Sequence, residues 1–538
     1  MGARLRSLNT PERRGWWVSF AILFVLGALW AVANPPTAAS DEPAHVVHAA
    51  AVSRGDFFGR PVTPAQFEEA PRRLGFGSNQ GGDAREYRSV YKSVRVPEIY
   101  NRPNWACYVL HPEQTAACLD FSGAQAVAGV LSQTTKYPPA FYAWVGEPAR
   151  LVSAGPGAVY VMRLASVVLV AALVASAVVS LRRVGDSPFV RLGLLVALTP
   201  VALFYGASVN PSGVEIAAAI ALWVSGAVLV SEARSSGNGH LDARLVARIG
   251  VAAGVLVLTR QLGPLWLGLT VLVLAGIAGM QGLRALRRSR ALWIWTGVVG
   301  ACLVAQLGWI MWVGALDPHN FLGTASHEDA ITLARTSIGE SASYLREMIG
   351  VFGWRDVPAP TLTLLIWVAA LAGLSALAVA FGRRREVVAL LVTGVATAVL
   401  PVALYVEQSG YAAWQGRYAM PLAVGVPVLA GLALRGTAVR NVRGGAVALV
   451  GAALGIGHVL AFAQNLRRYT VGAGGTVWFW TREAWSPPLP SLLLVVGFVA
   501  ATAVWVTWLL ASSPEARRAD RYEAEDARLD LVEAGAGA

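Results

Sequence analysis

The chain has 538 residues, of which 55% are hydrophobic and only 14% are charged, and its formal net charge is +12. An ordinary soluble domain is about 45–50% apolar and about 25% charged. This composition therefore excludes a disordered chain, a fibrous repeat and an ordinary soluble enzyme, and it indicates a polytopic membrane protein.

Apolar runs of about 17–25 residues can cross a bilayer as helices. The predicted fold class is all-α, a polytopic membrane protein of about 12 transmembrane helices (11–13) with a large first extracytoplasmic loop. The shorter stretch 138–152 contains Glu147 and Pro148, and an interfacial helix is expected there. The expected spans, in chain order, are 16–34, 157–181, 189–209, 211–231, 245–260, 262–280, 291–314, 361–381, 386–405, 419–434, 444–464 and 489–511.

Arginine is concentrated in every second connection between these spans and in the N-terminal tail. Positive residues mark cytoplasmic connections, so both termini are predicted to lie in the cytoplasm and the loop 35–156 outside it. The net charge is then a signal of topology, and no nucleic-acid partner is expected. The arginines of these connections are Arg182, Arg183, Arg234, Arg244, Arg284, Arg287, Arg288, Arg290, Arg383, Arg384, Arg385, Arg435, Arg440 and Arg443.

The sequence predicts one large domain with a short tail at each end. Residues 1–15 are expected to be a cytoplasmic tail, 16–511 the transmembrane domain including the extracytoplasmic loop 35–156, and 512–538 a second cytoplasmic tail. The first span is expected to remain as an anchor, because its apolar stretch is longer than the roughly 7–15 residues of a signal peptide. Frequent arginine and alanine favour a bacterial cytoplasmic (inner or plasma) membrane as the location.

Two of the three cysteines, Cys107 and Cys118, lie in the large outer loop. Thiols oxidise outside the cytoplasm, so a disulfide is predicted here, with two unpaired or buried thiols as the alternative. Cys302 falls within a span and is interpreted as a small core residue.

An acidic pair directly follows the first span, in the sequence SDEPAH at 40–45. Ser40 or Asp41 can cap a helix, and Asp41, His45 and His48 would then share one face of it at the outer membrane surface. A carboxylate held there could serve as a general base towards a hydroxyl group. The same spacing suits a divalent metal, and a helix cap with a solvated face is the structural alternative.

Several further polar residues lie at or near the outer ends of spans. A guanidinium group binds phosphate bidentately, so the basic members are candidates for holding an anionic ligand. Ion pairing, such as Arg163 with Glu215, and anchoring at the headgroup level are the alternatives. The set consists of Lys136, Tyr137, Arg163, Asn210, Glu215, Arg260, Arg355, Gln415, Arg417 and Tyr418.

A first span followed at once by an acidic pair, a large outer loop and a Pro-Pro-aromatic entry to the next segment resembles the GT-C glycosyltransferase superfamily. More narrowly, the chain is similar to the bacterial domain of unknown function 2142 family, and the resemblance covers about residues 16–510. The motifs that carry it are DEPAH at 41–45, SVNP at 208–211, GW at 353–354 and QGRY at 415–418.

The resemblance implies a GT-C-like fold and an inverting transfer of a sugar from a polyprenyl-phosphate-linked donor to an extracytoplasmic cell-envelope glycan or lipid. It places the general base at Asp41, with Glu42 in support. It leaves divalent-metal dependence and oligomeric state open, and no nucleotide cofactor is expected. Carrier-phosphate binding falls to Lys136, Arg163, Arg260, Arg355 and Arg417. Residues that would meet the acceptor or orient the helix are His45, His48, Tyr137, Asn210, Glu215, Gln415 and Tyr418.

Two other functions share part of this pattern. A transporter of a lipid or small solute commonly has twelve spans with both ends inside, but a first outer loop of about 100 residues and the lack of half-to-half repetition argue against it. A polysaccharide polymerase or ligase also uses lipid-linked glycans, but its large catalytic loop is expected later in the chain. Glycosyl transfer is therefore the preferred prediction.

Overall fold

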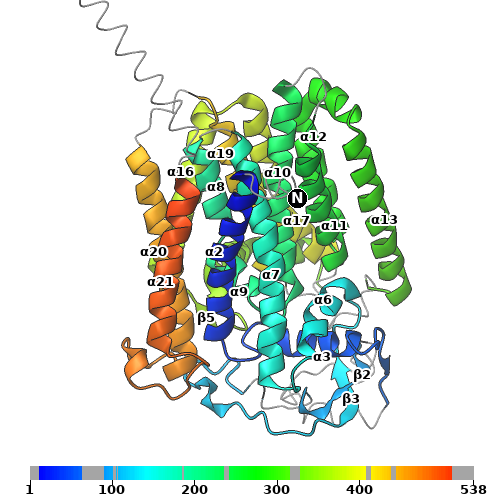
Figure 1. Ribbon diagram of the computed structural model, residues 1–538, viewed down its shortest axis with the longest axis vertical. Helices are drawn as coiled ribbons and strands as arrows, with labels where there is room; N and C mark the ends of the chain where they lie inside the picture. Colours follow the sequence, from blue (N-terminus) through cyan, green and yellow to red (C-terminus); the bar gives the residue numbers. More distant parts are fainter. Residues whose placement is uncertain are drawn as a thin grey trace, which may run out of the picture.

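The computed structural model describes residues 11–63, 90–100, 105, 107–184, 187–235, 241–315, 328–407, 414–437 and 444–511. Long helices form a bundle, and the described parts of residues 34–155, here called the loop domain, fold over one end of it (Figure 1). The predicted C-terminal tail 512–538 and most of the predicted N-terminal tail lie outside the described residues.

The bundle helices coincide with the predicted spans. Within the described residues, ten helices are long and apolar enough to cross a membrane, and the bent pair α8–α9 makes an eleventh span. Another helix, α11, has 17 residues and matches the predicted span 245–260. The fold class, a polytopic all-α membrane protein, is confirmed. The bundle consists of α2 (Pro11–Ala33), α7 (Pro156–Leu181), α8 (Pro188–Ala197), α9 (Pro200–Gly206), α10 (Pro211–Ser235), α11 (Ala243–Thr259), α12 (Gly263–Arg287), α13 (Arg290–Val313), α16 (Thr361–Phe381), α17 (Arg384–Glu407), α18 (Gly416–Ala423), α19 (Gly425–Ala433), α20 (Gly444–Val471) and α21 (Ser491–Leu510).

Burial separates a central helix from peripheral ones. The apolar stretch of α10 is 100% buried, which explains why it is apolar on every side, whereas the apolar stretch of α13 is only 11% buried. Large apolar side chains such as Val304, Met311 and Trp312 are exposed on α13. An outer surface of this kind matches hydrocarbon rather than water, as expected for a helix that faces lipid.

Proline sets the start of several bundle helices. Pro156 and Pro211 occupy the first turn of α7 and α10, where the missing N–H would have no partner in the helix. The chain bends by 57° between α8 and α9. At this bend the Thr199 hydroxyl accepts a hydrogen bond that caps α9. The short helix α9 then leads into the segment 207–210, which contacts the segment between α2 and the loop-domain helices.

The loop domain joins a small antiparallel sheet to two short helices. The sheet order is β1-β2-β3, and its main ladder pairs Lys92 with Ser132 at one end and Pro97 with Val127 at the other. The helix predicted within 138–152 is present as α6. The elements are α3 (Glu42–Val52), β1 (Arg60–Pro61), β2 (Lys92–Pro97), β3 (Val127–Ser132) and α6 (Pro139–Ala149).

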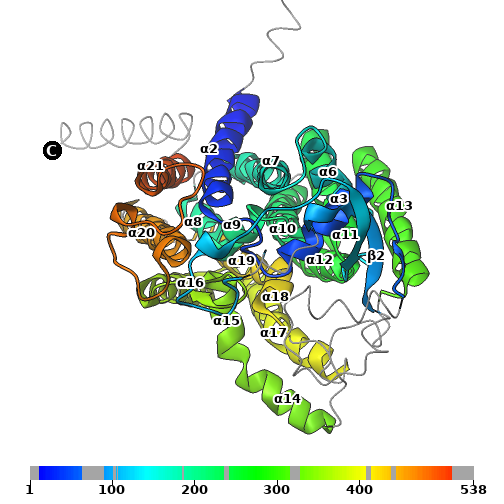
Figure 2. The same ribbon diagram turned by 90° about the horizontal axis from the view of Figure 1, so that it is seen from below.

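The two helices of the loop domain cross closely at Gly146. A Cβ atom at this position would lie 2.3 Å from the Ala49 carbonyl oxygen, so the crossing of α3 and α6 requires glycine. Seen from the loop-domain end, α3 lies over α10, α11 and α12 and β2 lies towards α13, whereas α20 and α21 lie to one side (Figure 2).

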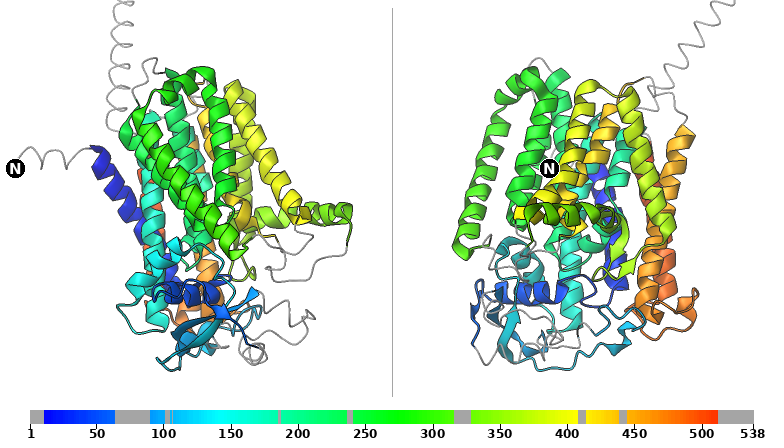
Figure 3. Two further views of the ribbon diagram at one scale, coloured as in Figure 1. Left: turned by 90° about the vertical axis from the view of Figure 1, so that its right-hand side faces the viewer. Right: turned by 180° about the vertical axis from the view of Figure 1, so that it is seen from behind.

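A second extra-membrane segment precedes α16. It contains α14 (Ala330–Gly339), α15 (Ser341–Gly350) and a two-stranded ladder, β4 (Val351–Phe352) with β5 (Val357–Pro358). Helix α14 projects sideways from the bundle, roughly across the direction of the long helices (Figure 3). Both segments lie toward the same end of the molecule.

The connection between α12 and α13 lies at the opposite end of the bundle from the loop domain (Figure 1). It carries Arg287, Arg288 and Arg290. The structure thus separates an arginine-rich end from the loop-domain end. That the arginine-rich end is cytoplasmic remains a prediction from the charge pattern.

A disulfide joins Cys107 to Cys118, as predicted. The loop that it closes is fastened to α20 by Arg468, which donates hydrogen bonds to the carbonyl oxygens of Tyr108 (3.0 Å), His111 (2.8 Å) and Gln114 (2.6 Å). The third cysteine, Cys302, is a free, half-buried thiol on α13.

Candidate functional site

The segment between α2 and α3 is the centre of the candidate site. Thr37 and Asp41 have φ angles of 71° and 63°, in the left-handed region that non-glycine residues rarely adopt. Such residues persist only where surrounding contacts determine the backbone. Here the contacts come from two segments far away in the sequence, the SVNP and GW motifs.

The GW motif holds this segment from one side. The Gly353 carbonyl oxygen accepts hydrogen bonds from the Ser40 N–H (3.1 Å) and the Ser40 hydroxyl (3.0 Å). The Trp354 indole N–H donates to the Thr37 carbonyl oxygen at 3.2 Å. Gly353 itself has φ 66°, and a Cβ there would lie 2.3 Å from the Asp356 carboxylate, so glycine is required.

The SVNP motif holds the segment from the other side. The Asn210 side-chain amide donates to the Ser40 carbonyl oxygen at 3.0 Å, and its oxygen accepts from the Ser212 N–H at 3.0 Å. The Val209 N–H donates to the Glu42 carboxylate at 2.9 Å. Asn210, which the sequence assigns to acceptor contact or helix orientation, therefore positions the backbone next to Asp41.

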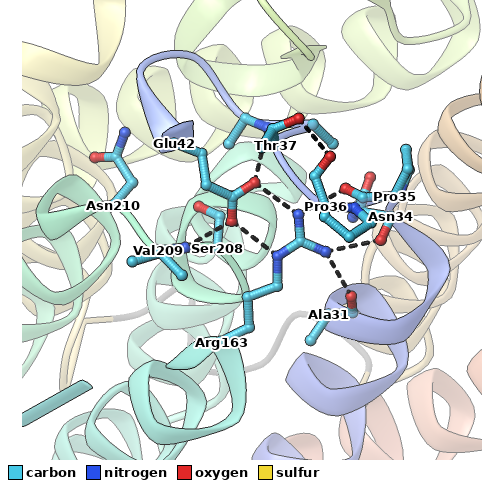
Figure 4. A network of polar contacts seen from close by, with 12 residues as sticks. Ala31, Asn34, Pro35, Pro36, Thr37, Glu42, Arg163, Ser208, Val209 and Asn210 are labelled. Carbon is cyan, nitrogen blue, oxygen red and sulfur yellow. Dashed lines mark hydrogen bonds and ion pairs between the residues drawn. The ribbon is translucent and has the colours of Figure 1, made fainter. Parts of the chain in front are cut away.

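Glu42 and Arg163 form a buried ion pair at the base of the segment (Figure 4). Both side chains have 0% exposure. The guanidinium donates bidentately to the carboxylate, with Nε to Oε1 at 2.8 Å and Nη2 to Oε2 at 2.6 Å. Its other donors reach the carbonyl oxygens of Ala31 (3.0 Å), Asn34 (2.7 Å) and Pro35 (2.7 Å), where α2 ends.

This pair changes the interpretation of two predicted site residues. Arg163 cannot meet a carrier phosphate in this arrangement, because it is fully buried and each of its five N–H groups is engaged. Its partner is Glu42 and not Glu215, the alternative that the sequence suggested. Glu42 is equally enclosed, so in this arrangement its carboxylate holds the segment in place and does not face solvent.

The neighbouring acid, Asp41, faces a different environment. Its carboxylate accepts from Arg417 Nη2 at 2.6 Å, and the Asp41 side chain is 32% exposed. The expected cap is not formed: Asp41 occupies the N-cap position of α3, but its side chain makes no capping hydrogen bond. The carboxylate is directed instead towards α18, the helix that begins with the QGRY motif.

Arg417 and Arg260 lie together around the ring of Tyr418. The two guanidinium carbons are 5.2 Å and 4.8 Å from the centre of that ring. Arg417 is also 4.9 Å from the centre of the Tyr205 ring and donates to its hydroxyl at 2.9 Å. Arg260 lies 5.8 Å from the centre of the Tyr137 ring. Cations stacked on aromatic faces keep a fixed orientation and remain charged.

Arg260 is further fixed by α10. It pairs with the Glu215 carboxylate at 3.2 Å and donates to the Ser212 hydroxyl at 3.0 Å. Glu215 is 1% exposed, so its role in the structure is to hold Arg260 in place. Lys136 is also largely buried, and its carbonyl oxygen accepts from the Trp309 indole at 3.0 Å and the Gln261 amide at 3.4 Å.

The two histidines pack beneath this cluster on α3. The His45 Nδ1 lies 2.8 Å from the Tyr142 hydroxyl, and its ring packs edge-on against Tyr137. His48 packs against Tyr142 with ring centres 4.2 Å apart. Burial lowers the pKa of His45 well below 6.5, with Arg417 lowering it further, and burial lowers the pKa of His48 to about 3. Both rings are therefore neutral at physiological pH.

The metal alternative has no support in the described ranges. No three His, Cys, Asp or Glu side chains there come together in an arrangement that could hold a metal ion. In the structure His45 and His48 contribute packing and a hydrogen bond to the α3–α6 contact.

Arg355 reaches the cluster indirectly. It has φ 69° and pairs with Glu347 at 2.6 Å. The other oxygen of Glu347 accepts from the Gly416 N–H at 2.6 Å, so this carboxylate joins the GW and QGRY segments. Gly416 is required here because a Cβ would lie 2.3 Å from the Tyr344 carbonyl oxygen. Gln415 directly precedes α18, and its side-chain oxygen is buried.

Sequence reasoning missed several residues that build the site. Tyr205 and Glu347 contact the QGRY segment, yet each is a single residue without a motif around it. Asp356 accepts from the Trp354 N–H at 2.9 Å and lies 3.7 Å from Arg468. Only the proximity of Asp356 to the GW motif provided a signal in the sequence.

The fold and this cluster define a polytopic membrane protein with a polar site at one end of its bundle, where the loop domain meets the ends of several spans. Residues 24–426 match the family described as "Predicted membrane protein (DUF2142)". The chain belongs to this family, and the resemblance drawn from its four motifs is confirmed at that level. No curated protein matches the chain.

Proposed function

We propose that this protein is a membrane glycosyltransferase of GT-C type. It moves a sugar from a polyprenyl-phosphate-linked donor to a hydroxyl group of a glycan or lipid acceptor, on the extracytoplasmic face of a bacterial cytoplasmic membrane. The observation that carries the proposal is the partly exposed Asp41 carboxylate, held 2.6 Å from Arg417 beside Arg260.

The contrast between adjacent acids supports Asp41 as the base. Glu42 is enclosed by Arg163 and by the Val209 N–H. Asp41 has one guanidinium partner and 32% exposure, so a substrate hydroxyl can approach its carboxylate. A general base must come within hydrogen-bond reach of the proton that it accepts.

Arg417 and Arg260 are the proposed binding groups for the phosphate of the donor. A phosphate competes with a carboxylate for a guanidinium because it offers more charge and more acceptor oxygens. In this proposal the carrier phosphate binds Arg417 and Arg260, and the Asp41 carboxylate is released from Arg417 towards the acceptor.

The bonds then change in one displacement. Asp41 takes the proton of the acceptor hydroxyl while that oxygen forms a bond to the anomeric carbon of the donor sugar. The bond between this carbon and the carrier phosphate oxygen breaks, and its electron pair leaves with the phosphate. Arg417 and Arg260 stabilise the negative charge that develops on the phosphate. The configuration at the anomeric carbon inverts.

A transfer assay with matched variants tests the proposal. Asp41→Asn keeps the shape of the side chain and should reduce transfer from a polyprenyl-phosphate sugar by about 10²–10⁴-fold. Asp120→Asn changes an exposed acid of the same loop domain and should retain parental transfer. Parental transfer by folded Asp41→Asn, or equal losses in both variants, would contradict the proposed mechanism.

A further inference from the structure

A cavity of about 880 Å³ lies where α10 and α19 end and α17 begins, at the arginine-rich end of the bundle. This is the end away from the Asp41 site, and the proposed glycosyl transfer makes no use of it. Charged residues dominate its lining, which includes Arg234, Arg383, Arg384, Arg385, Glu386 and Arg435.

The charges of this lining are not balanced. Arg234 pairs with Glu386 at 2.7 Å, and Glu386 is almost fully buried. Among the described residues, the other four arginines of the lining form no ion pair with a carboxylate. Among the described residues, the lining of the cavity therefore holds five guanidinium groups and one carboxylate, that of Glu386.

These arginines come from separate segments. Arg383 lies in the connection between α16 and α17, Arg384 and Arg385 begin α17, and Arg435 follows α19. The rule that positive residues mark cytoplasmic connections explains why each connection carries arginines. It does not explain why arginines of different connections meet in one cavity. Their convergence calls for a further explanation.

Two glycines lie against guanidinium groups of this lining. A Cβ at Gly436, which has φ 67°, would lie 3.0 Å from Arg383 Nη2. A Cβ at Gly279, where α12 is kinked, would lie 2.7 Å from Arg385 Nη1. Burial lowers the pKa of Arg435 and Arg383 lowers it further, whereas Glu232 acts in the opposite direction. Arg383 and Arg435 are thus close enough to repel each other, an arrangement that a bound anion would stabilise.

The start of α17 adds to the positive field. Arg384 is the first residue of this 24-residue helix. The N-terminal end of a helix carries a partial positive charge and free N–H groups, which favour an anion. Basic pockets between transmembrane helices near a membrane surface suit phosphate-bearing headgroups.

We infer that this cavity binds a phosphate-bearing anion through Arg383, Arg384 and Arg435. The phosphate comes either from the headgroup of an anionic lipid in the adjacent leaflet or from a soluble phosphate compound. Both sources share the chemistry of a phosphate held by guanidinium groups.

Binding by the full chain in detergent tests this inference. The probes are phosphatidylglycerol, phosphatidylcholine as the lipid without net charge, and inorganic pyrophosphate as the soluble source. The cavity variant is Arg383→Gln with Arg435→Gln. The matched control is Arg287→Gln with Arg288→Gln, which removes the same charge from exposed arginines of the same end that do not line the cavity.

The cavity variant should bind phosphatidylglycerol or pyrophosphate at least about tenfold more weakly than the parent does. The affinity of the control variant should stay within about twofold of the parental affinity. A loss for phosphatidylglycerol alone identifies a lipid headgroup, and a loss for pyrophosphate as well identifies the phosphate itself. Arg384→Glu, a single change at an exposed position, should also weaken binding of the phosphate probes relative to the parent and the control variant. Equal losses of affinity in the cavity and control variants would overturn the inference. So would a parent protein that binds phosphatidylglycerol and pyrophosphate no more tightly than phosphatidylcholine.

Discussion

The adjacent acids Asp41 and Glu42 should respond differently to loss of charge. Glu42→Gln replaces a carboxylate oxygen by an amide that donates, and this amide would face the donors of Arg163. Removing one partner of a buried pair typically costs about 3–5 kcal/mol, because the other charge is left buried without compensation. We expect this loss in the free energy of unfolding of Glu42→Gln.

Asp41→Asn is the control one residue away. Asp41 is 32% exposed, and Asn retains an oxygen that can accept from Arg417. The loss of stability should therefore be smaller than that of Glu42→Gln, although Arg417 is itself buried and loses a charged partner. The two variants lose the same formal charge from the same segment, so their difference isolates burial and pairing.

The difference in stability between the two variants can be measured by heating the purified proteins in detergent and determining the fraction that remains monodisperse at each temperature. A double-mutant cycle with Arg163→Leu should give a coupling energy of about 2 kcal/mol between positions 42 and 163. Equal unfolding curves for Glu42→Gln and Asp41→Asn would refute the conclusion that the Glu42–Arg163 pair fixes this segment.

Three further outcomes follow from the fold. In intact cells and a Cys302→Ala background, an impermeant thiol reagent should label Ser122→Cys but not Arg288→Cys; the reverse pattern would invert the topology. Reduction of the loop-domain disulfide should lower the free energy of unfolding by about 2–4 kcal/mol, and an unchanged thermal midpoint would contradict this. Because the pKa of His48 is about 3 in the fold and 6.5 when unfolded, the folded state binds fewer protons between these values. Stability should therefore fall as the pH drops through this window, by up to about 1.4 kcal/mol per unit, and His48→Phe should flatten that slope.

The features that sequence alone predicts are local ones. Each span is a continuous apolar run, so its position follows from hydropathy, and the short helix α6 follows from the same kind of pattern. Asp41 stands out because it comes directly after a span. The disulfide follows from two cysteines in a loop that is predicted to lie outside the cytoplasm.

Ion pairs between residues far apart in the chain could not be predicted from the sequence. Arg163, Glu42 and Glu215 are all near the same end, and spacing cannot show which carboxylate each guanidinium meets, since the answer depends on the rotation and packing of α7 and α10. The structure pairs Arg163 with Glu42 and Arg260 with Glu215. The phosphate role predicted for Arg163 was wrong for this reason.

The central claim is that Asp41, Arg260 and Arg417 form a site for a lipid-linked sugar. A cryo-EM map of the protein with a polyprenyl-phosphate sugar tests it most directly. The account predicts density for the phosphate against Arg260 and Arg417, with the anomeric carbon on the side of Asp41. Carrier density bound elsewhere, with the Asp41–Arg417 pair intact, would contradict it.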